Sequence, residues 1–226
     1  MYAITGITGN VGGSVANNLL AAGRPVRAVM RNIGKGDVWA ERGCEVVQAE
    51  IADATSLASA FKGAEGVFVL VPPNFDPAPG FPEARATAAS LKSALERADP
   101  GRVVYLSTIG AQARESNLLT QHTIIEQVLG ELPMPITFLR PAWFMENFRW
   151  DVAAARESGV IMRFLQPLDK TVPMVATADI GREAAKLLQE SWTGLRVVEL
   201  EGPRRVTPDE VADRIWTLVA AAVGRA

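Results

Sequence analysis

The residues with the clearest chemical meaning form a glycine-rich run near the start of the chain. Gly6, Gly9 and Gly12 stand three residues apart, between a short apolar segment and a helical pattern. After a strand, the first glycine permits a sharp turn, the second lets the backbone approach a pyrophosphate, and the third lets helix and strand pack closely. Free N–H groups at the start of the helix then attract phosphate. The run predicts a dinucleotide site rather than a tight turn without a ligand, formed by Gly6, Thr8, Gly9, Asn10, Val11 and Gly12.

The choice of coenzyme depends on the residues that follow the second predicted strand. A NAD-specific site usually places an Asp or Glu there, where it binds the ribose 2′-hydroxyl. Here the strand is followed by Arg31 and Asn32, with Lys35 nearby. Cations at this place suit a 2′-phosphate, both by charge and by the fork geometry of arginine. The sequence therefore favours NADP(H), with NAD(H) and a merely solvated Arg31 as the alternatives.

The Tyr-x-x-x-Lys pair that would supply an acid for ketone reduction is absent. Both tyrosines fall in predicted strands, with Gly6 four residues beyond Tyr2 and Ile109 four residues beyond Tyr105. A positioned acid contributes about 10²–10⁴-fold to such a reaction. Reduction of a quinone gives a stabilised anion that can take its proton from water. The missing acid therefore disfavours alcohol–ketone chemistry far more than quinone chemistry.

His122 is the only histidine of the chain, and Glu126 follows it by one helical turn. This spacing favours a couple between the two side chains on one helix face. The functional interpretation is that His122 contacts a bound ligand or donates a proton. A helix-face histidine bonded to its neighbour is the equally weighted alternative.

Short strand-like runs alternate with helical patterns along the whole chain. This alternation, with nearly continuous apolar strands, is typical of a doubly wound α/β fold with a mainly parallel sheet. We expect one Rossmann-type domain over residues 1–226. Asp53 is placed to cap a helix that runs through Phe61, and Thr207, Pro208 and Glu210 together predict the start of the last helix. The predicted strands are Tyr2–Thr5, Val26–Met30, Glu45–Gln48, Gly66–Val71, Arg102–Ser107, Ile136–Leu139 and Arg196–Leu200.

Two irregular segments follow the carboxyl ends of predicted strands, where ligands bind in open α/β sheets. One is the proline-rich run that starts at Pro72 and Pro73, and the other spans residues 141–173 and is rich in large apolar side chains. We expect both to form walls of the site.

Composition excludes several classes of protein. The 226 residues are 48% hydrophobic and 21% charged, with a formal net charge of −2, which gives no general attraction to nucleic acid or anionic lipid. A single cysteine, Cys44, excludes an intramolecular disulfide, and with one histidine it also argues against a His/Cys metal site. No apolar stretch is long enough to span a bilayer, and the first residues do not resemble a signal peptide. We expect a cytoplasmic protein without a metal.

Several motifs together resemble the NmrA-like branch of the atypical short-chain dehydrogenases/reductases. This group includes NAD(P)H:quinone oxidoreductases and nucleotide-sensing regulators. The resemblance is carried by the glycine run and by Val29-Met30-Arg31-Asn32, Val67-Phe68-Val69-Leu70-Val71-Pro72-Pro73, Leu106-Ser107-Thr108-Ile109-Gly110-Ala111, Phe138-Leu139-Arg140-Pro141-Ala142-Trp143-Phe144-Met145-Glu146-Asn147 and Glu201-Gly202-Pro203-Arg204-Arg205-Val206-Thr207.

The resemblance implies roles for further residues. Glu50 would lie near the adenine, and Val71 and Pro72 would line the cofactor. When Glu126 is aligned with the family's glutamate, Leu118 takes the place of the usual catalytic tyrosine and His122 that of the lysine, which would put His122 near the nicotinamide and its ribose. Ser107 stands where related enzymes hold a serine that faces the substrate, so we expect Ser107 and His122 to be catalytic residues that also contact the cofactor; the alternative for Ser107 is a hydroxyl that caps a turn. The expected substrate contacts are Pro73, Trp143, Phe144 and Asn147.

The function that the sequence favours is an NADPH-dependent oxidoreductase that passes hydride to a quinone or similar flat acceptor. The alternative is a non-catalytic NAD(P) sensor that regulates a partner protein. Relatives usually continue beyond the helix that starts at Thr207, so we expect a small substrate lobe from about 141–176 and 201–226, with a pocket that is shallow, incomplete or completed by another subunit. The chain is expected to be a monomer or homodimer.

Overall fold

The computed structural model describes residues 1–161 and 165–223 of the chain. It divides into two compact units. The first comprises Met1–Arg140 and Ala178–Leu200, and the second comprises Pro141–Thr177 and the segment from Glu201 onward.

The first unit is built on a seven-stranded sheet in the order β3-β2-β1-β4-β5-β6-β9. The pairs β1–β2, β2–β3, β1–β4, β4–β5 and β5–β6 are all parallel. The chain runs outward from β1 to β3 and then returns to place β4 on the other side of β1. A ligand crevice forms at such a reversal, outside the carboxyl ends of the strands. The strands are β1 (Tyr2–Thr5), β2 (Val26–Met30), β3 (Glu45–Gln48), β4 (Gly66–Leu70), β5 (Val103–Leu106), β6 (Ile136–Pro141) and β9 (Leu195–Leu200).

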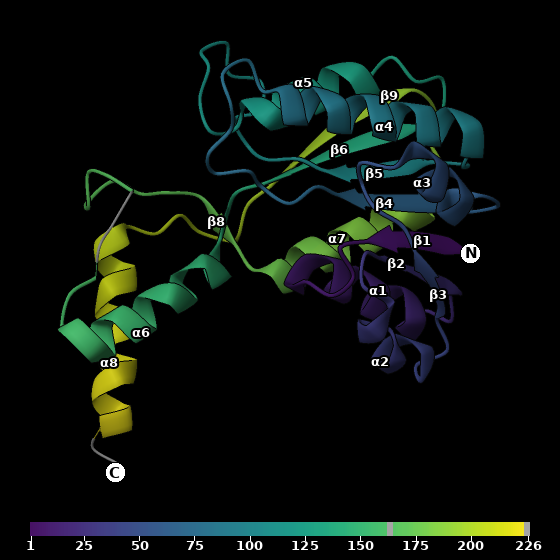
Figure 1. Ribbon diagram of the computed structural model, residues 1–226. Coiled ribbons are helices and arrows are strands. Elements are labelled where there is room, and N and C mark those ends of the chain that lie inside the picture. Colours follow the sequence, from purple (N-terminus) through teal and green to yellow (C-terminus); the bar gives the residue numbers. More distant parts are fainter. Residues whose placement is uncertain (162–164, 224–226) are drawn as a thin grey trace. The chain divides into compact units, whose positions relative to one another are not determined.

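Helices cover both faces of this sheet. Figure 1 shows α3, α4 and α5 on one face and α1 and α7 on the other. The central strands are therefore buried on both sides, and Val67, Phe68 and Val69 are each 0% exposed. Asp53 caps α3 as predicted, because its carboxylate accepts the N–H groups of Thr55 and Ser56. The helical segments are α1 (Asn10–Ala21), η1 (Ile33–Lys35), α2 (Asp37–Ala40), α3 (Ala54–Phe61), α4 (Pro82–Ala98), α5 (Thr120–Leu129) and α7 (Thr177–Gln189).

The second unit has a small apolar cluster between two helices, in which Ala155 and Ile215 are buried. The capping box at Thr207 is confirmed, since Glu210 N–H donates to Thr207 Oγ1 over 3.1 Å and Thr207 N–H donates to Glu210 Oε2 over 2.7 Å. The elements of this unit are β7 (Trp143–Phe144), η2 (Met145–Phe148), α6 (Arg149–Ser158), β8 (Met174–Val175) and α8 (Pro208–Val223), and β7 pairs with β8 in parallel.

Two features are absent from the described residues. Within 1–161 and 165–223 we find no helix with the length and apolar character needed to cross a membrane. The same residues contain no group of three or more His, Cys, Asp or Glu side chains that could hold a metal ion.

Candidate functional site

The glycine run forms the turn between β1 and α1. Gly6 has a φ of +63°, which favours glycine, and Gly9 N–H donates to Gly6 O over 3.0 Å. A Cβ on Gly12 would lie 2.3 Å from Gly6 O, so only glycine allows the helix to start this close to the strand. Gly9 is the N-cap of α1 and provides no side-chain oxygen to its N–H groups. This helix end is therefore suited to receive an anion.

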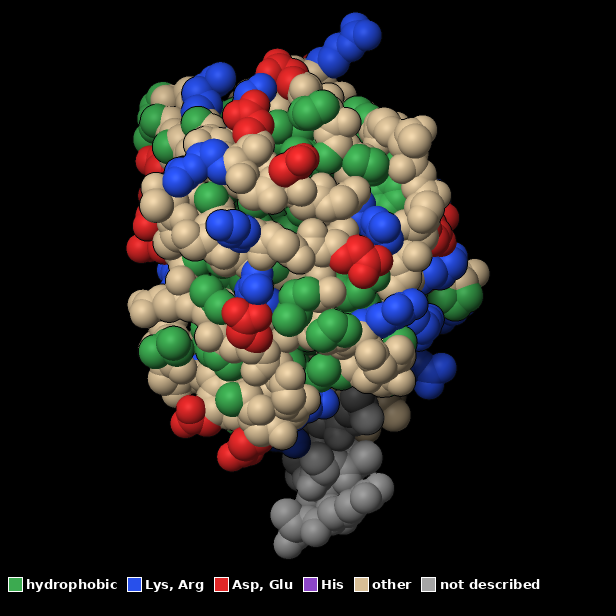
Figure 2. Space-filling model, turned by 90° about the vertical axis from the view of Figure 1, so that its right-hand side faces the viewer, with side chains coloured by type: hydrophobic (Ala, Val, Ile, Leu, Met, Phe, Trp, Pro, Cys, Tyr) green, Lys and Arg blue, Asp and Glu red, His purple; other side chains and the backbone are tan. Residues whose placement is uncertain are grey.

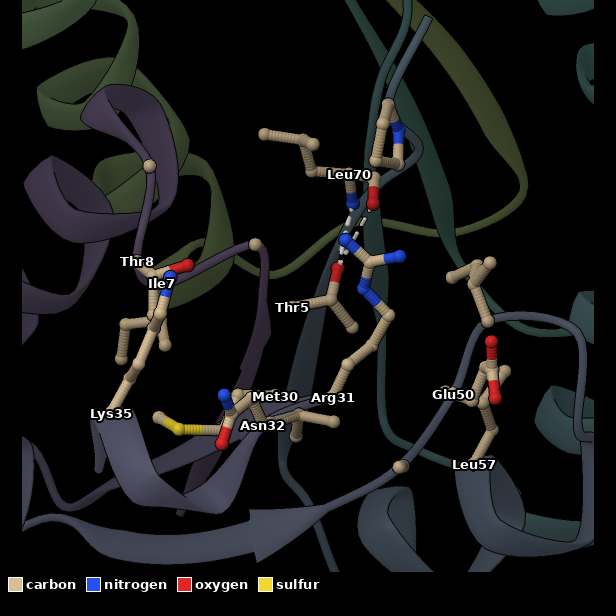
Figure 3. Close-up of a pocket in the computed structure, with 16 residues that line it drawn as sticks. Thr5, Ile7, Thr8, Met30, Arg31, Asn32, Lys35, Glu50, Leu57 and Leu70 are labelled. Atoms are coloured by element: carbon tan, nitrogen blue, oxygen red, sulfur yellow. Dashed lines mark hydrogen bonds between the residues drawn. The ribbon is translucent and has the colours of Figure 1, made fainter. Parts of the chain in front are cut away.

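A cavity of about 340 Å³ lies at this turn, outside the carboxyl ends of the first four strands. Its floor is held by Thr5, whose Oγ1 accepts the Leu70 N–H over 2.8 Å and joins β1 to β4 (Figure 3). The lining combines backbone with small, apolar and charged side chains. It consists of Thr5, Gly6, Ile7, Thr8, Gly9, Val29, Met30, Arg31, Asn32, Lys35, Ala49, Glu50, Ile51, Leu57, Leu70 and Pro72.

The charged side chains of this cavity come from the segments that follow β2 and β3. In Figure 3, Arg31 lies between Lys35 on one side and Glu50 on the other. Arg31 and Lys35 are both exposed, and neither forms an ion pair with any residue in the described part of the chain. Asn32 is used locally, because its Oδ1 accepts the Gly34 N–H over 3.0 Å and caps η1. Two cations are thus available to a ligand that carries a phosphate.

A second polar cluster lies where α5 packs against the carboxyl ends of β5 and β6. It consists of Ser107, Glu126 and Arg140. Ser107 and Glu126 are buried, at 4% and 7% exposure. Ser107 Oγ donates to Glu126 Oε1 over 2.5 Å, and Arg140 donates to both carboxylate oxygens of Glu126, over 2.9 and 2.5 Å. The hydrogen bonds to Glu126 raise the pKa of Arg140 above its usual value. The three side chains join α5 to the sheet.

His122 lies in the first turn of α5 and contacts the neighbouring strand. Its Nδ1 is 2.7 Å from Tyr105 Oη, and its Nε2 is 3.4 Å from Gln121 Nε2. Burial lowers the pKa of His122 to about 4, against a smaller opposing effect of Glu126, so the imidazole is neutral at pH 7. Burial also raises the pKa of Tyr105 well above its usual value. These groups therefore form a neutral hydrogen-bonded pair.

The expected couple between His122 and Glu126 is not what the structure shows. The hydrogen bonds of Glu126 go to Ser107 and Arg140, and the short contact of His122 goes to Tyr105. The reason is electrostatic. The charged guanidinium group of Arg140 stabilises the buried carboxylate of Glu126 far better than the neutral imidazole of His122 would.

The structure brings part of the predicted site together. Of the predicted cofactor contacts, those that line the cavity are Gly6, Thr8, Gly9, Arg31, Lys35, Glu50 and Pro72. Those outside its lining are Asn10, Val11, Gly12, Val71, Ser107 and His122. Val11 is buried in the packing of α1, and Gly12 serves the close helix contact described above. The roles of these residues toward a ligand stay predictions.

The predicted substrate contacts fall in different parts of the chain. Pro73 belongs to the loop after β4 in the first unit, and it is exposed. Trp143, Phe144 and Asn147 all belong to the second unit, where Trp143 is 36% exposed. Their part in a substrate site stays a prediction.

Several residues of the cavity were not among the predicted site residues. They are Thr5, Ile7, Val29, Met30, Asn32, Ala49, Ile51, Leu57 and Leu70. Most of them stand at or just after the carboxyl end of a strand. The rule that places ligands at these ends would have identified them once the strand order was known.

The chain is similar in sequence to proteins of known family and activity. The sequence pattern described as the NmrA-like family matches residues 2–220. Quinone oxidoreductase 2 of Escherichia coli (strain K12) is 28% identical over 224 residues, which are 98% of this chain and 72% of that protein. The NAD(P)H azoreductase of Xenophilus azovorans is also 28% identical, over 100% of this chain and 74% of its own length.

Solved structures of similar fold include two with a bound coenzyme. The NADPH-dependent quinone oxidoreductase of Escherichia coli, complexed with NADPH, has a TM-score of 0.81 and 26% identity, and the match covers 97% of this chain and 76% of that one. The triphenylmethane reductase of Citrobacter sp., complexed with NADP(H), has a TM-score of 0.79 and 26% identity over 94% of this chain and 73% of that one.

Proposed function

Because the chain belongs to the NmrA-like family, we propose that it is an NADPH-dependent oxidoreductase that transfers hydride to a quinone or similar flat acceptor. The observation that carries the proposal is the cavity at the β1–α1 turn. It combines the N-terminus of α1, which has no side-chain cap, with Arg31 and Lys35, which form no ion pair among residues 1–161 and 165–223. The curated relatives named above are a quinone oxidoreductase and an azoreductase, and both names describe reduction of a small-molecule acceptor.

The residues of the cavity fit a phosphorylated dinucleotide. Gly9 allows the pyrophosphate to approach the backbone, and the first turn of α1 offers N–H groups to it. Arg31 and Lys35 suit a 2′-phosphate. At the end of β2, where a carboxylate would favour NADH, the chain has Arg31 and Asn32 instead. Ala49, Ile51 and Leu57 offer an apolar surface for the adenine. When bound, NADPH would supply the hydride from its nicotinamide ring.

The side chains available for proton transfer favour an acceptor that needs no strong acid. Leu118, aligned with the usual catalytic tyrosine, is 48% exposed and has no proton to give. The hydroxyls of Tyr105 and Ser107 are already bonded to His122 and Glu126. A quinone meets this condition, since its reduced anion takes a proton from water. A ketone does not, because the alkoxide that forms needs a positioned donor.

The lack of an available proton donor also favours a second candidate function, a non-catalytic NADP(H) sensor. In that case the occupied hydroxyls of Tyr105 and Ser107 have only structural roles. The sensor would bind NADPH tightly, distinguish it from NADP⁺ and show no turnover.

An acceptor panel tests the proposed function and separates it from the sensor. Purified protein is assayed anaerobically with NADPH and benzoquinones, naphthoquinones, azo dyes and simple ketones, and each reduced product is quantified. We expect turnover with the quinones and a loss of at least about 100-fold with the ketones. A protein that binds NADPH but reduces none of these acceptors would be a sensor.

A further inference from the structure

Two neighbouring side chains at the start of α5 bring hydrogen-bond donors together. Gln121 is only 6% exposed, and its Oε1 accepts the backbone N–H of Asn74 over 3.2 Å. Because a backbone N–H needs an acceptor, this bond assigns the amide oxygen to the Asn74 side. The amide NH₂ group then lies on the other side, 3.4 Å from Nε2 of His122.

The partner of His122 assigns its tautomer. Tyr105 is 0% exposed, and His122 Nδ1 is the only hydrogen-bond partner of its hydroxyl among the described residues. A buried hydroxyl without an acceptor is costly, so Tyr105 donates and Nδ1 accepts. In a neutral imidazole the ring hydrogen is then on Nε2, which makes Nε2 a donor.

Both atoms of the 3.4 Å contact are therefore donors, and they cannot satisfy each other. Each is nevertheless oriented by a second partner, Gln121 by Asn74 and His122 by Tyr105. We propose that Gln121 and His122 form a paired hydrogen-bond donor for an oxygen atom of a bound small molecule, either a hydroxyl of the coenzyme or a carbonyl of the acceptor. Tyr105 and Asn74 are positioning residues for this pair.

This inference rests on the proposed function and deepens it. A pair of neutral N–H groups stabilises negative charge that develops on an oxygen, without giving up a proton. Such a pair suits an acceptor whose product is a stabilised anion. It also gives a chemical role to the helix position where the usual catalytic lysine is replaced by histidine.

Nitrogen-15 NMR of the intact protein tests the pair, because His122 is the only histidine and its ring signals need no assignment. Protein labelled with ¹⁵N-histidine is measured at neutral pH alone, then with saturating NADP⁺, then with added naphthoquinone. We expect the Nε2–H tautomer in the free protein and a shift of the Nε2–H signals in one of the two additions. A shift with NADP⁺ alone identifies a coenzyme hydroxyl, and a shift only with the quinone identifies the acceptor carbonyl.

Four variants, one of them a control, connect the spectra to binding. Gln121→Met removes the amide donor, and with it the oxygen that accepts the Asn74 N–H, with little change in shape. It should raise the Kd of the identified ligand, or the KM, by about tenfold. The control Gln127→Met changes an exposed glutamine of the same helix and should leave these constants unchanged. Tyr105→Phe keeps the ring but removes the hydroxyl, so the Nδ1–H tautomer of His122 should appear in the spectra. His122→Gln retains one acceptor and one donor, so it should keep most of the affinity for the identified ligand.

The results that overturn the pair differ from those that overturn the proposed function. An Nδ1–H tautomer in the free protein, or Nε2–H signals that respond to neither addition while NADPH is still consumed, would refute the donor pair alone. Quinone reduction that fails while the Nε2–H signals respond to NADP⁺ would refute the reductase and leave the pair in place.

Discussion

Arg31 tests coenzyme choice at the scale of a single residue. It extends into the cavity without an ion-pair partner among the described residues, so a 2′-phosphate would be its main partner. We expect Arg31→Ala to raise the KM for NADPH by about 10- to 100-fold, the value of one or two charge-assisted hydrogen bonds, and to leave the KM for NADH unchanged. Arg182→Ala, which changes an exposed arginine paired with Asp179 on the same unit, is the control. Equal effects on both coenzymes would contradict a contact with the 2′-phosphate.

His122 makes a prediction about pH. Its pKa is about 4 in the folded protein and about 6.5 when unfolded, so below about pH 6.5 the unfolded state binds the extra proton. The free energy of unfolding should therefore decrease as the pH falls from about 6.5 to about 4, by on the order of 3 kcal/mol. Urea unfolding across this range measures the decrease, with His122→Gln as the reference that lacks the imidazole. A wild-type slope equal to that of the variant would show that His122 does not titrate as inferred.

The pair of Glu126 and Arg140 predicts an effect on stability. Both side chains are largely buried, and removal of one partner leaves the other charge without compensation. We expect Glu126→Ala to lower the free energy of unfolding by about 3–5 kcal/mol. Glu199→Ala is the control, because Glu199 is half-exposed and lies 3.8 Å from the same arginine. Similar small losses in the two variants would argue against a buried, hydrogen-bonded pair.

The seven strands of the large sheet could be predicted from the sequence to within one or two residues at each end. The Tyr2–Thr5, Val26–Met30 and Glu45–Gln48 strands are confirmed, because alternation of apolar strands and helices is a local signal. The glycine turn could be predicted for the same reason. The Arg140–Glu126 and Tyr105–His122 contacts could not, since each joins residues 14 or more positions apart and depends on how α5 packs against the sheet.

The β1–α1 turn makes a prediction at the scale of elements. A Cβ at Gly12 would collide with the backbone of Gly6, so Gly12→Ala must move α1 away from β1 and distort the phosphate site. We expect this variant to lose NADPH binding by at least about 100-fold, as well as stability. Gly13→Ala meets its nearest atom at 3.1 Å and should have a much smaller effect. Calorimetric titration with NADPH measures the difference, and equal losses would contradict the close packing of turn and helix.

At the scale of the whole molecule, bound coenzyme should slow hydrogen exchange most in the strands whose carboxyl ends line the cavity. Ligand at about 100 times its Kd stabilises the state that binds it by about 2.7 kcal/mol. Hydrogen exchange should therefore slow at the carboxyl ends of β1, β2 and β4 and at the start of α1, more with NADPH than with NADH at equal concentration. Unchanged exchange at the β1–α1 turn would exclude this cavity as the coenzyme site.

The most direct test of the reductase is a single-turnover experiment in a rapid-mixing instrument. Stoichiometric protein and NADPH are mixed anaerobically with a naphthoquinone, and the loss of NADPH absorbance is compared with hydroquinone formation. Gly9→Asp is the control, since Gly9 has an ordinary φ of −94° and the new carboxylate would repel a pyrophosphate. We predict one hydroquinone per NADPH with the wild-type protein and no protein-dependent reaction with the variant. Bound NADPH that persists in the presence of quinone, or equal rates in the two proteins, would contradict hydride transfer at this site.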